Sequence, residues 1–363
     1  MKFSVNSKMF ENKIDNSDYI EIKSYNKIYD VSYSDKNLIQ LINEIYNKND
    51  FILIDRNVYN LDNNSLNNID SQYYYLFDAI EDNKIIDYVL KIVDILYNLK
   101  FNKKNKLIVI GGGITQDIGG FISAIYKRGL NWTFIPTTIL SMTDSAIGGK
   151  VGINRNSKNI LALFVSPNKI YISDFFLKSL KEEDIISGLG ESLKLGLIGG
   201  EETYNIFKNN YNNEYKNYIN IIKMSTSVKK EIVEFDELEK NERRVLNYGH
   251  TLGHAIESSC NYFIPHGIAV LFGMYFINKL FYDDKYEDLN NYILNIIPNK
   301  FKNLNISYNE FLSHILNDKK NDGDNICFIL LNNIGESIFV FKKISDINDK
   351  LKILFNEIFL DKV

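Results

Sequence analysis

Three of the four histidines in this 363-residue chain cluster in one short stretch. His250 and His254 are four positions apart, and His266 follows between Pro265 and Gly267. Histidines four apart project from the same face of a helix, and imidazole is both the commonest metal ligand and a proton carrier near neutral pH. The stretch therefore predicts a metal site in which His250 and His254 pair on one helical turn, while His266 and a carboxylate from elsewhere complete the set. The alternative is a group of surface histidines or satisfied core histidines.

Charged side chains elsewhere in the second half are candidates to complete such a site. Glu191 and Lys194 lie three apart in Gly188-Leu-Gly-Glu-Ser-Leu-Lys194, on a predicted helix. A surface ion pair is the simpler explanation of that spacing, but Glu191 is the best candidate for the missing oxygen ligand. Further polar residues recur at helical spacing and lead up to the histidines: Lys229, Glu239, Arg243 and Asn247. A charged helical face explains some of them, and we expect Arg243, Asn247, His250 and His254 to share one helical stripe.

A glycine-rich segment in the first half has the features of a phosphate loop. Gly111-Gly-Gly-Ile-Thr-Gln-Asp117-Ile-Gly-Gly120 follows an apolar run and precedes an expected helix. Glycine lets the backbone approach a pyrophosphate at the amide-rich start of a helix. The spacing is not the GxGxxG fingerprint, and a tight turn without a ligand explains the glycines equally well. Asp55, at the end of an earlier strand, is a candidate to bind the hydroxyls of a nucleotide.

A second loop combines glycine with lysine. It reads Asp144-Ser-Ala-Ile-Gly-Gly-Lys150, and Lys158-Asn159 follow a few residues later. Glycine beside lysine suggests the close approach of an anion, with the ammonium as a point charge. Taken alone, the motif is better explained by a loop lysine in solvent.

The elements that must position these residues divide the chain in two. Apolar runs at 50–54, 106–110 and 132–135 predict buried strands, and helical spacing at 85–99 and 116–127 predicts helices between them. This alternation indicates a parallel sheet with crossover helices. From residue 178 to 281 almost everything is predicted to be helix, including 219–234 and 268–281, and 326–331 is a strand-like exception. The boundary is expected near 172–182.

Composition restricts the class of protein. The chain is 45% hydrophobic and 24% charged, with a net charge of −4 and no basic block, so we expect a globular protein that does not bind nucleic acid. Cys260 and Cys327 have no CxxC spacing, which argues against a disulfide scaffold and a thiolate zinc site. We find no signal peptide at the N-terminus and no apolar run long enough to span a membrane. We therefore expect a cytoplasmic protein.

From about residue 51 to 335, the ordered motifs together resemble the 3-dehydroquinate synthase family of sugar-phosphate cyclases. The matching motifs are Gly111-Gly-Gly-x-x-x-Asp117, Arg128-Gly129, Pro136-Thr-Thr138, Asp144-Ser-x-x-Gly-Gly-Lys150, Lys158-Asn159, Glu191-x-x-Lys194, Leu246-Asn-x-Gly-His-Thr-x-Gly-His254, His266-Gly267 and Asp318-Lys-Lys320. So many matches in one order are implausible by chance.

The resemblance implies a fold, cofactors and a reaction. It implies an N-terminal Rossmann-like α/β domain that binds NAD, here residues 1–177, and a mostly helical domain for metal and substrate, 178–363, with the site in the cleft between them. Members bind NAD and a divalent metal, Zn²⁺ or Co²⁺, and the resemblance also implies a homodimer. They convert 3-deoxy-arabino-heptulosonate 7-phosphate into 3-dehydroquinate by transient oxidation, phosphate elimination, re-reduction and an aldol closure. This reaction serves aromatic amino acid biosynthesis through the shikimate pathway.

The resemblance also assigns roles to individual residues. The implied metal ligands are Glu191, His250 and His266, which leaves His254 for proton transfer and replaces the pairing of His250 with His254. Contacts to the phosphate end are implied for Arg128, Lys150, Asn159, Arg243 and one of Lys319 or Lys320. Contacts to the hydroxyl and carboxylate end are implied for Asp144, Lys194, Lys229 and Asn247, with Glu239 close to that group. The implied NAD-binding residues are Asp55, Asn57, Glu81, Lys84, Gly112, Gly113, Asp117, Thr137, Thr138, Leu140, Lys150, Lys158 and Ser179.

Three departures from the family pattern bear on the substrate. The loop from Lys150 to Lys158 is about one residue shorter than usual, which would shift Lys158 and Asn159. Ile268 stands where the family usually has glutamate, so a partner for a metal ligand or a nearby base would be missing. Ala162 and Val165-Ser166 also differ from the family's usual residues.

Three other functions compete with the synthase. Another sugar-phosphate cyclase, of the 2-deoxy-scyllo-inosose or valiolone type, would act on a substrate without a carboxylate, which the basic and polar set around Lys150, Arg243 and Asn247 disfavours. A metal-dependent NAD(P) alcohol dehydrogenase would leave stoichiometric NADH. A non-catalytic NAD-binding protein would not need the catalytic residue types that are present.

Overall fold

The chain forms two compact units. The computed structural model describes residues 1–25, 27–211, 215–317 and 325–359. We call Ile14–Lys181 with Asn210–Leu238 the α/β unit, and Met1–Lys13 with Glu182–Asn209 and Glu239–Val363 the helical unit. The expected domains, 1–177 and 178–363, differ from these units in two segments. The first thirteen residues belong to the helical unit, and residues 210–238 belong to the α/β unit.

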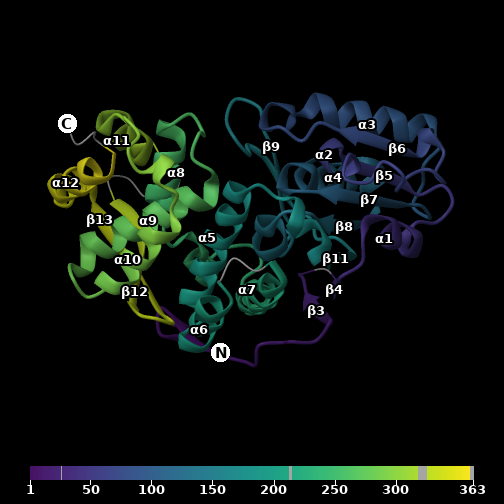
Figure 1. Ribbon diagram of the computed structural model, residues 1–363. Helices are drawn as coiled ribbons and strands as arrows, with labels where there is room; N and C mark the ends of the chain where they lie inside the picture. Colours follow the sequence, from purple (N-terminus) through teal and green to yellow (C-terminus); the bar gives the residue numbers. More distant parts are fainter. Residues whose placement is uncertain (26, 212–214, 318–324, 360–363) are drawn as a thin grey trace. The chain divides into compact units, whose positions relative to one another are not determined.

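A seven-stranded sheet forms the centre of the α/β unit (Figure 1). Its order is β3 (Tyr19–Lys23), β4 (Ile28–Ser34), β11 (Lys169–Ser173), β8 (Asn131–Pro136), β7 (Lys106–Gly111), β5 (Phe51–Asp55) and β6 (Tyr74–Phe77). Only β3 and β4 pair antiparallel, and the other neighbours are parallel. The carboxyl ends of β6, β5, β7 and β8 therefore meet at one edge, where ligands bind in open parallel sheets.

Helices and one hairpin complete this unit. They are α1 (Leu38–Ile45), α2 (Arg56–Tyr59), α3 (Ile86–Asn98), α4 (Gly113–Ile125), α7 (Tyr215–Phe235), and the antiparallel pair β9 (Lys150–Ile153) and β10 (Leu161–Phe164). α4 starts three residues before the predicted helix, directly at the glycines. The predicted strands at 50–54, 106–110 and 132–135 are present within a residue at each end. The predicted Rossmann-like class of parallel α/β sheet is confirmed.

The helical unit is built around a buried central helix. Its helices are α5 (Glu182–Ile198), α6 (Glu201–Asn210), α8 (His250–Ser259), α9 (His266–Tyr282), α10 (Glu287–Ile296), α11 (Tyr308–Leu316) and α12 (Asn348–Phe359). α9 is buried on almost every side and contacts α5, α8, α10 and α12. A helix that is apolar all round needs such a shell, because no face of it can be left to water. Within the described residues, no helix has the length and apolarity required to cross a membrane.

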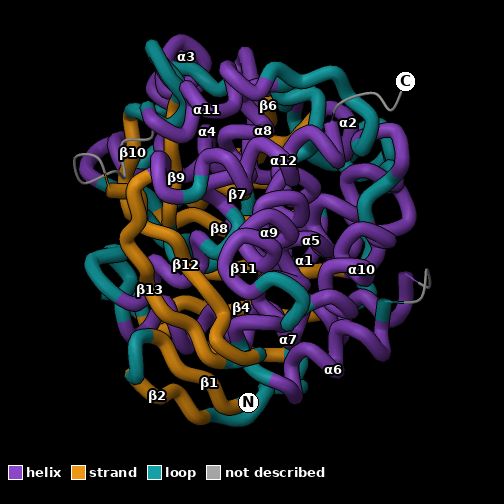
Figure 2. The backbone as a smooth tube through the Cα atoms, turned by 90° about the vertical axis from the view of Figure 1, so that its left-hand side faces the viewer, coloured by secondary structure: helices purple, strands orange, loops and turns teal. Residues whose placement is uncertain are grey.

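A four-stranded sheet lies beside these helices in the same unit (Figure 2). Its order is β12 (Asn325–Asn333), β13 (Glu336–Lys343), β1 (Lys2–Val5) and β2 (Lys8–Glu11). β1 pairs parallel with β13, so the start of the chain is part of the C-terminal unit. The sequence indicated only β12 of this sheet, as a strand-like run at 326–331.

Candidate active site

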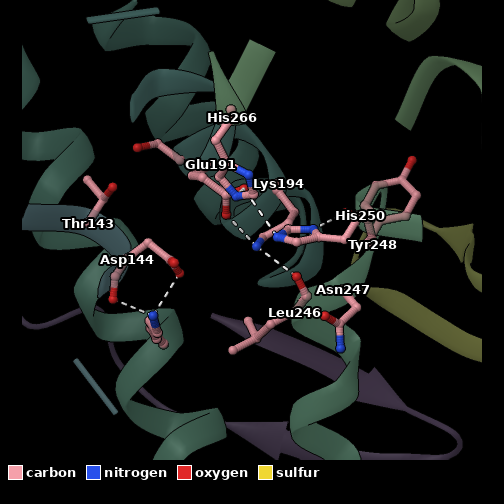
Figure 3. Close-up of polar contacts among 12 residues, drawn as sticks. Thr143, Asp144, Glu191, Lys194, Leu246, Asn247, Tyr248, His250 and His266 are labelled. Carbon is pink, nitrogen blue, oxygen red and sulfur yellow. Dashed lines mark hydrogen bonds and ion pairs between the residues drawn. The ribbon is translucent and has the colours of Figure 1, made fainter. Parts of the chain in front are cut away.

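Two histidines converge on one carboxylate oxygen inside the helical unit (Figure 3). His250 Nε2 and His266 Nε2 each lie 3.5 Å from Glu191 Oε1. A tetrahedral ion with bonds of about 2.1 Å would hold its ligand atoms about 3.4 Å apart. Two imidazole nitrogens and a carboxylate oxygen form a typical donor set for a catalytic Zn²⁺ site. These three residues therefore fit a divalent metal in both chemistry and spacing.

The other nitrogen of each histidine is also engaged. His250 Nδ1 lies 3.2 Å from the main-chain oxygen of Tyr248, and His266 Nδ1 lies 3.1 Å from Glu257 Oε2. Such partners fix the tautomer of a ligating imidazole and turn its remaining nitrogen toward the metal. The family glutamate that Ile268 replaces was expected to leave a partner missing. His266 nevertheless has a carboxylate partner in Glu257, and Ile268 is fully buried.

The same carboxylates control the charge of His266. Burial lowers the pKa of His266, but the hydrogen bonds to Glu191 and Glu257 outweigh burial and raise it to about 10. In the metal-free protein both nitrogens of the His266 ring are therefore protonated at neutral pH, and the ring is positively charged. A proton held between His266 and Glu191 neutralises part of the charge that a metal cation would neutralise.

His254 lies beside His250 and His266, and its ring packs against both of their rings. Its ring centroid is 5.2 Å from that of His250 and 5.4 Å from that of His266. One nitrogen from each of the three histidines falls within 4.8 Å of the others, so a site formed by three histidines is the geometric alternative. We favour the set with Glu191, because its oxygen is equidistant from two nitrogens whose partners already orient them.

A turn ends immediately before His250, the first histidine of the cluster. A 3₁₀ turn, Glu242–Asn247, contains Arg243 and Asn247, Gly249 has φ +80°, and α8 begins at His250. The prediction that Arg243, Asn247, His250 and His254 share one helical stripe is therefore wrong. Glycine adopts this left-handed conformation without strain, which allows the chain to change direction at that point.

Glycines next to the candidate ligands let their helices touch through the backbone. A Cβ on Gly267 would lie 1.8 Å from the oxygen of Ser187, and one on Gly190 would lie 2.4 Å from the oxygen of Gly267. Gly249 and Gly273 make a similar contact between the start of α8 and α9. Helix α9, which starts with His266, is thus in main-chain contact both with α5, which carries Glu191, and with the start of α8, which carries His250. The sequence motifs contain these glycines, but their contacts depend on how the helices pack.

The helical unit also holds two buried cations and a partly buried amide that the sequence predicted for the site. Lys194 is 1% exposed, forms an ion pair with Glu191 and donates a 2.7 Å hydrogen bond to the oxygen of Leu246. Arg243 is also 1% exposed, and Asn247 Nδ2 donates to Glu239 Oε1 at 3.2 Å. The structure thus brings Lys194 to Glu191 and Asn247 to Glu239, whereas Lys229 belongs to the α/β unit. Lys319 and Lys320 lie outside the described residues.

The predicted nucleotide residues of the α/β unit gather at the carboxyl ends of its strands. Asp55 ends β5 and accepts a 2.8 Å hydrogen bond from the amide of Asn57, and burial raises the pKa of Asp55. Gly112 precedes α4, and a Cβ there would lie 3.1 Å from Thr138. Thr137 donates its amide to the oxygen of Gly111. The glycine loop after β7 and the threonines after β8 thus form one continuous edge.

A buried lysine links several of the remaining nucleotide residues. Lys84 Nζ is 3.0 Å from Asp117 Oδ2, 3.4 Å from Glu81 Oε1 and 2.7 Å from Asn159 Oδ1. Asp117 also accepts a hydrogen bond from the amide of Gly152, at 3.0 Å. Burial raises the pKa of Asp117 to about 6, although Lys84 opposes this. Asn159, which the family resemblance places at the phosphate, is therefore tied to the nucleotide residues.

A second cation in this unit pairs with a predicted substrate residue. Lys229 on α7 is buried, and its Nζ lies 2.7 Å from Asp144 Oδ1. The other predicted residues of the unit lie on separate segments. Arg128 is exposed after α4, Lys150 is exposed at the start of β9, Lys158 follows in the loop after β9, Leu140 follows the threonines, and Ser179 donates to the oxygen of Phe176.

The sequence did not single out two residues that orient the candidate ligands. Glu257 had no assigned role, and Tyr248 was an unspecified position within a motif. The position of Glu257 seven residues after His250 does place it on the helical face of that ligand. Tyr248 acts through its main-chain oxygen, which no side-chain pattern reveals.

The fold is that of solved sugar-phosphate cyclases. A 2-deoxy-scyllo-inosose synthase solved with carbaglucose-6-phosphate, NAD⁺ and Co²⁺ superposes with a TM-score of 0.80 at 20% identity, covering 92% of this chain and 99% of that one. A 2-epi-5-epi-valiolone synthase from Streptomyces hygroscopicus, solved with NAD⁺ and Zn²⁺, gives 0.78 at 21% identity over 91% and 97%.

Sequence comparison identifies the family. The model of the 3-dehydroquinate synthase N-terminal domain matches residues 74–187, and that of its C-terminal domain matches residues 188–321. A 3-dehydroquinate synthase from Pelagibacter ubique is 34% identical over 84% of this chain and 89% of its own length. The chain belongs to the 3-dehydroquinate synthase family.

Proposed function

We propose that this chain is a metal- and NAD-dependent 3-dehydroquinate synthase that converts 3-deoxy-arabino-heptulosonate 7-phosphate into 3-dehydroquinate and phosphate. The observation that carries the proposal is the approach of His250 Nε2 and His266 Nε2 to one oxygen of Glu191, both at 3.5 Å. Family membership supports the substrate, because named members share more than 30% identity over most of this chain. A site of this geometry would hold Zn²⁺ or Co²⁺, the ions in the two solved cyclases.

The cofactors would supply the electrophilic and redox chemistry. A divalent ion held by Glu191, His250 and His266 would polarise substrate hydroxyls, and NAD would accept and later return a hydride. The residues at the strand ends of the α/β unit, from Asp55 to Thr138, would bind NAD. The glycines at the start of α4 would leave room for its pyrophosphate.

The protein's own residues would bind the two anionic ends of the substrate and move its protons. Lys194 and Arg243 are each 1% exposed, so a carboxylate or phosphate that reaches them gains attraction largely unscreened by water. His254 lies next to both metal histidines and is only partly buried, which suits a group that exchanges protons with a substrate hydroxyl. For Lys229 and Asp144, which pair with each other in the α/β unit, the family resemblance implies contacts to the substrate.

An assay with the purified protein tests this function directly. With NAD and Zn²⁺ present, phosphate should be released from the heptulosonate phosphate without accumulation of absorbance at the nicotinamide band. Release from glucose 6-phosphate or sedoheptulose 7-phosphate instead would identify another cyclase. Stoichiometric NADH without phosphate release would identify an alcohol dehydrogenase.

The state of the protein in the cell is part of the proposal. We infer a homodimer that acts in the cytoplasm, and the family resemblance supports the homodimer. Light scattering on the purified protein would measure the mass of the particle.

A further inference from the structure

Three polar side chains form a hydrogen-bonded string in the core of the helical unit. Tyr248 Oη donates to Asn278 Oδ1 at 2.7 Å, and Asn278 Nδ2 donates to Asn290 Oδ1 at 3.0 Å. Tyr248 and Asn278 are fully buried, and Asn290 is 1% exposed. The string joins the turn before α8 to α9 and α10, and its neighbours are mainly apolar.

Filling this part of the core with polar side chains costs free energy. Burying polar groups costs free energy even when they are bonded, and apolar residues of similar size usually pack at least as well. The string is also incomplete, because Asn290 Nδ2 has no hydrogen-bond partner among the described residues. Unlike apolar packing, the hydrogen bond from Tyr248 to Asn278 fixes the orientation of the Tyr248 side chain relative to α9.

The direction of Tyr248 matters because its backbone contacts a candidate metal ligand. The main-chain oxygen of Tyr248 lies 3.2 Å from His250 Nδ1. Next along the chain is Gly249, the left-handed residue packed against the backbone of α9. Asn278, which holds the ring of Tyr248, lies on the same helix that starts with His266.

We propose that Tyr248, Asn278 and Asn290 are positioning residues for the metal site. They hold the Tyr248 carbonyl where it orients His250, and they fix the position of that carbonyl relative to α9, the helix that carries His266. The inference rests on the proposed metal-binding function of Glu191, His250 and His266. It concerns how precisely two ligands on separate helices are aligned, and it does not change which residues bind the ion.

Substitution Tyr248→Phe tests the proposal, because it keeps the ring and removes only the hydroxyl. We expect the dissociation constant for Zn²⁺, measured by competition with a chromophoric chelator, to rise about tenfold, the lower end of the range for outer partners of metal ligands. The visible absorption of the Co²⁺-loaded protein should also change in shape, because it reports ligand geometry. The matched control is Tyr286→Phe, which removes the hydroxyl of a buried tyrosine that bonds the oxygen of Leu331 in β12. The control should keep the wild-type Zn²⁺ affinity and Co²⁺ spectrum.

A second variant separates positioning from stability. In Tyr248→Phe with Asn278→Leu and Asn290→Leu, every polar group orphaned by the first change is removed, so thermal stability should recover while Zn²⁺ affinity stays low. Recovery of Zn²⁺ affinity together with stability would overturn the proposal, as would a Tyr248→Phe protein with wild-type affinity and Co²⁺ spectrum. Wild-type protein that binds no Zn²⁺ would instead refute the metal site itself, so the two failures are distinguishable.

Discussion

Removal of the Glu257 carboxylate should weaken metal binding without dismantling the fold. Glu257 Oε2 lies 3.1 Å from His266 Nδ1, and the two side chains are 13% and 29% exposed. Partners of this kind are worth about 10–100-fold in metal affinity, or about 1.4–2.7 kcal/mol. Glutamine retains an acceptor oxygen but loses the charge, so Glu257→Gln should lie near tenfold. Alanine leaves the ring without an acceptor, so Glu257→Ala should lie near a hundredfold.

Competition with a chelator at fixed pH measures this effect. Glu183→Gln is a suitable control, because Glu183 lies on α5, the helix that carries Glu191, and pairs with Lys300 at the surface. A surface pair contributes little, so the control should bind Zn²⁺ as the wild type does. Dissociation constants within twofold of wild type for both Glu257 variants would refute the idea that this carboxylate orients His266.

Four further results are expected. His250→Ala should lose stoichiometric Zn²⁺, whereas His254→Ala should keep the metal but lose phosphate release. The control His314→Ala, at an exposed position on α11, should change neither property. Zinc retained by His250→Ala would exclude His250 as a ligand. Gly267→Ala should cost stability at the upper end of the about 1–3 kcal/mol typical of overpacking, because its Cβ would lie 1.8 Å from a backbone oxygen. Gly113→Ala has room and should fold normally, but it should bind NAD more weakly if the pyrophosphate approaches this helix start; unchanged NAD affinity would argue against that. Since the pKa of Asp117 is raised from 3.8 to about 6, its contribution to stability is fully present below pH 3.8 and is lost as the pH rises through 6. Chemical unfolding without NAD should therefore show about 1 kcal/mol lost between pH 5 and 7, relative to Asp117→Asn; parallel pH profiles would contradict the raised pKa.

The sequence predicted the strands β5, β7 and β8 of the parallel sheet, because they are buried on both faces and form continuous apolar runs. Periodicity worked less well around the histidines. Arg243 and Asn247 have helical spacing, but they lie in a 3₁₀ turn that Gly249 separates from α8. A spacing pattern cannot distinguish one helix from two short ones joined by a left-handed glycine.

Contacts between distant segments were the other limit. The pairing of β1 with β13 joins residues more than three hundred positions apart, and no local pattern announces it. The orienting role of Glu257 also depends on the path of the chain from α8 into α9. Ile268 illustrates the same limit, since its departure from the family pattern suggested a missing partner that Glu257 provides.

The exchange of segments between the two units has a consequence for how the protein is made. Helix α7 follows the α/β strands in the chain by more than forty residues but packs on β3, where Lys23 bonds Glu234, and its Thr226 bonds Tyr33 of β4. A ribosome must therefore complete residue 238 before the α/β unit has all its parts. In the helical unit, β1 cannot pair with β13 until that strand has been synthesised, near the end of the chain. Fragments cut near residue 177 would leave each unit without one of its segments, so we expect the α/β unit to fold only after residue 238 and the helical unit only after β13.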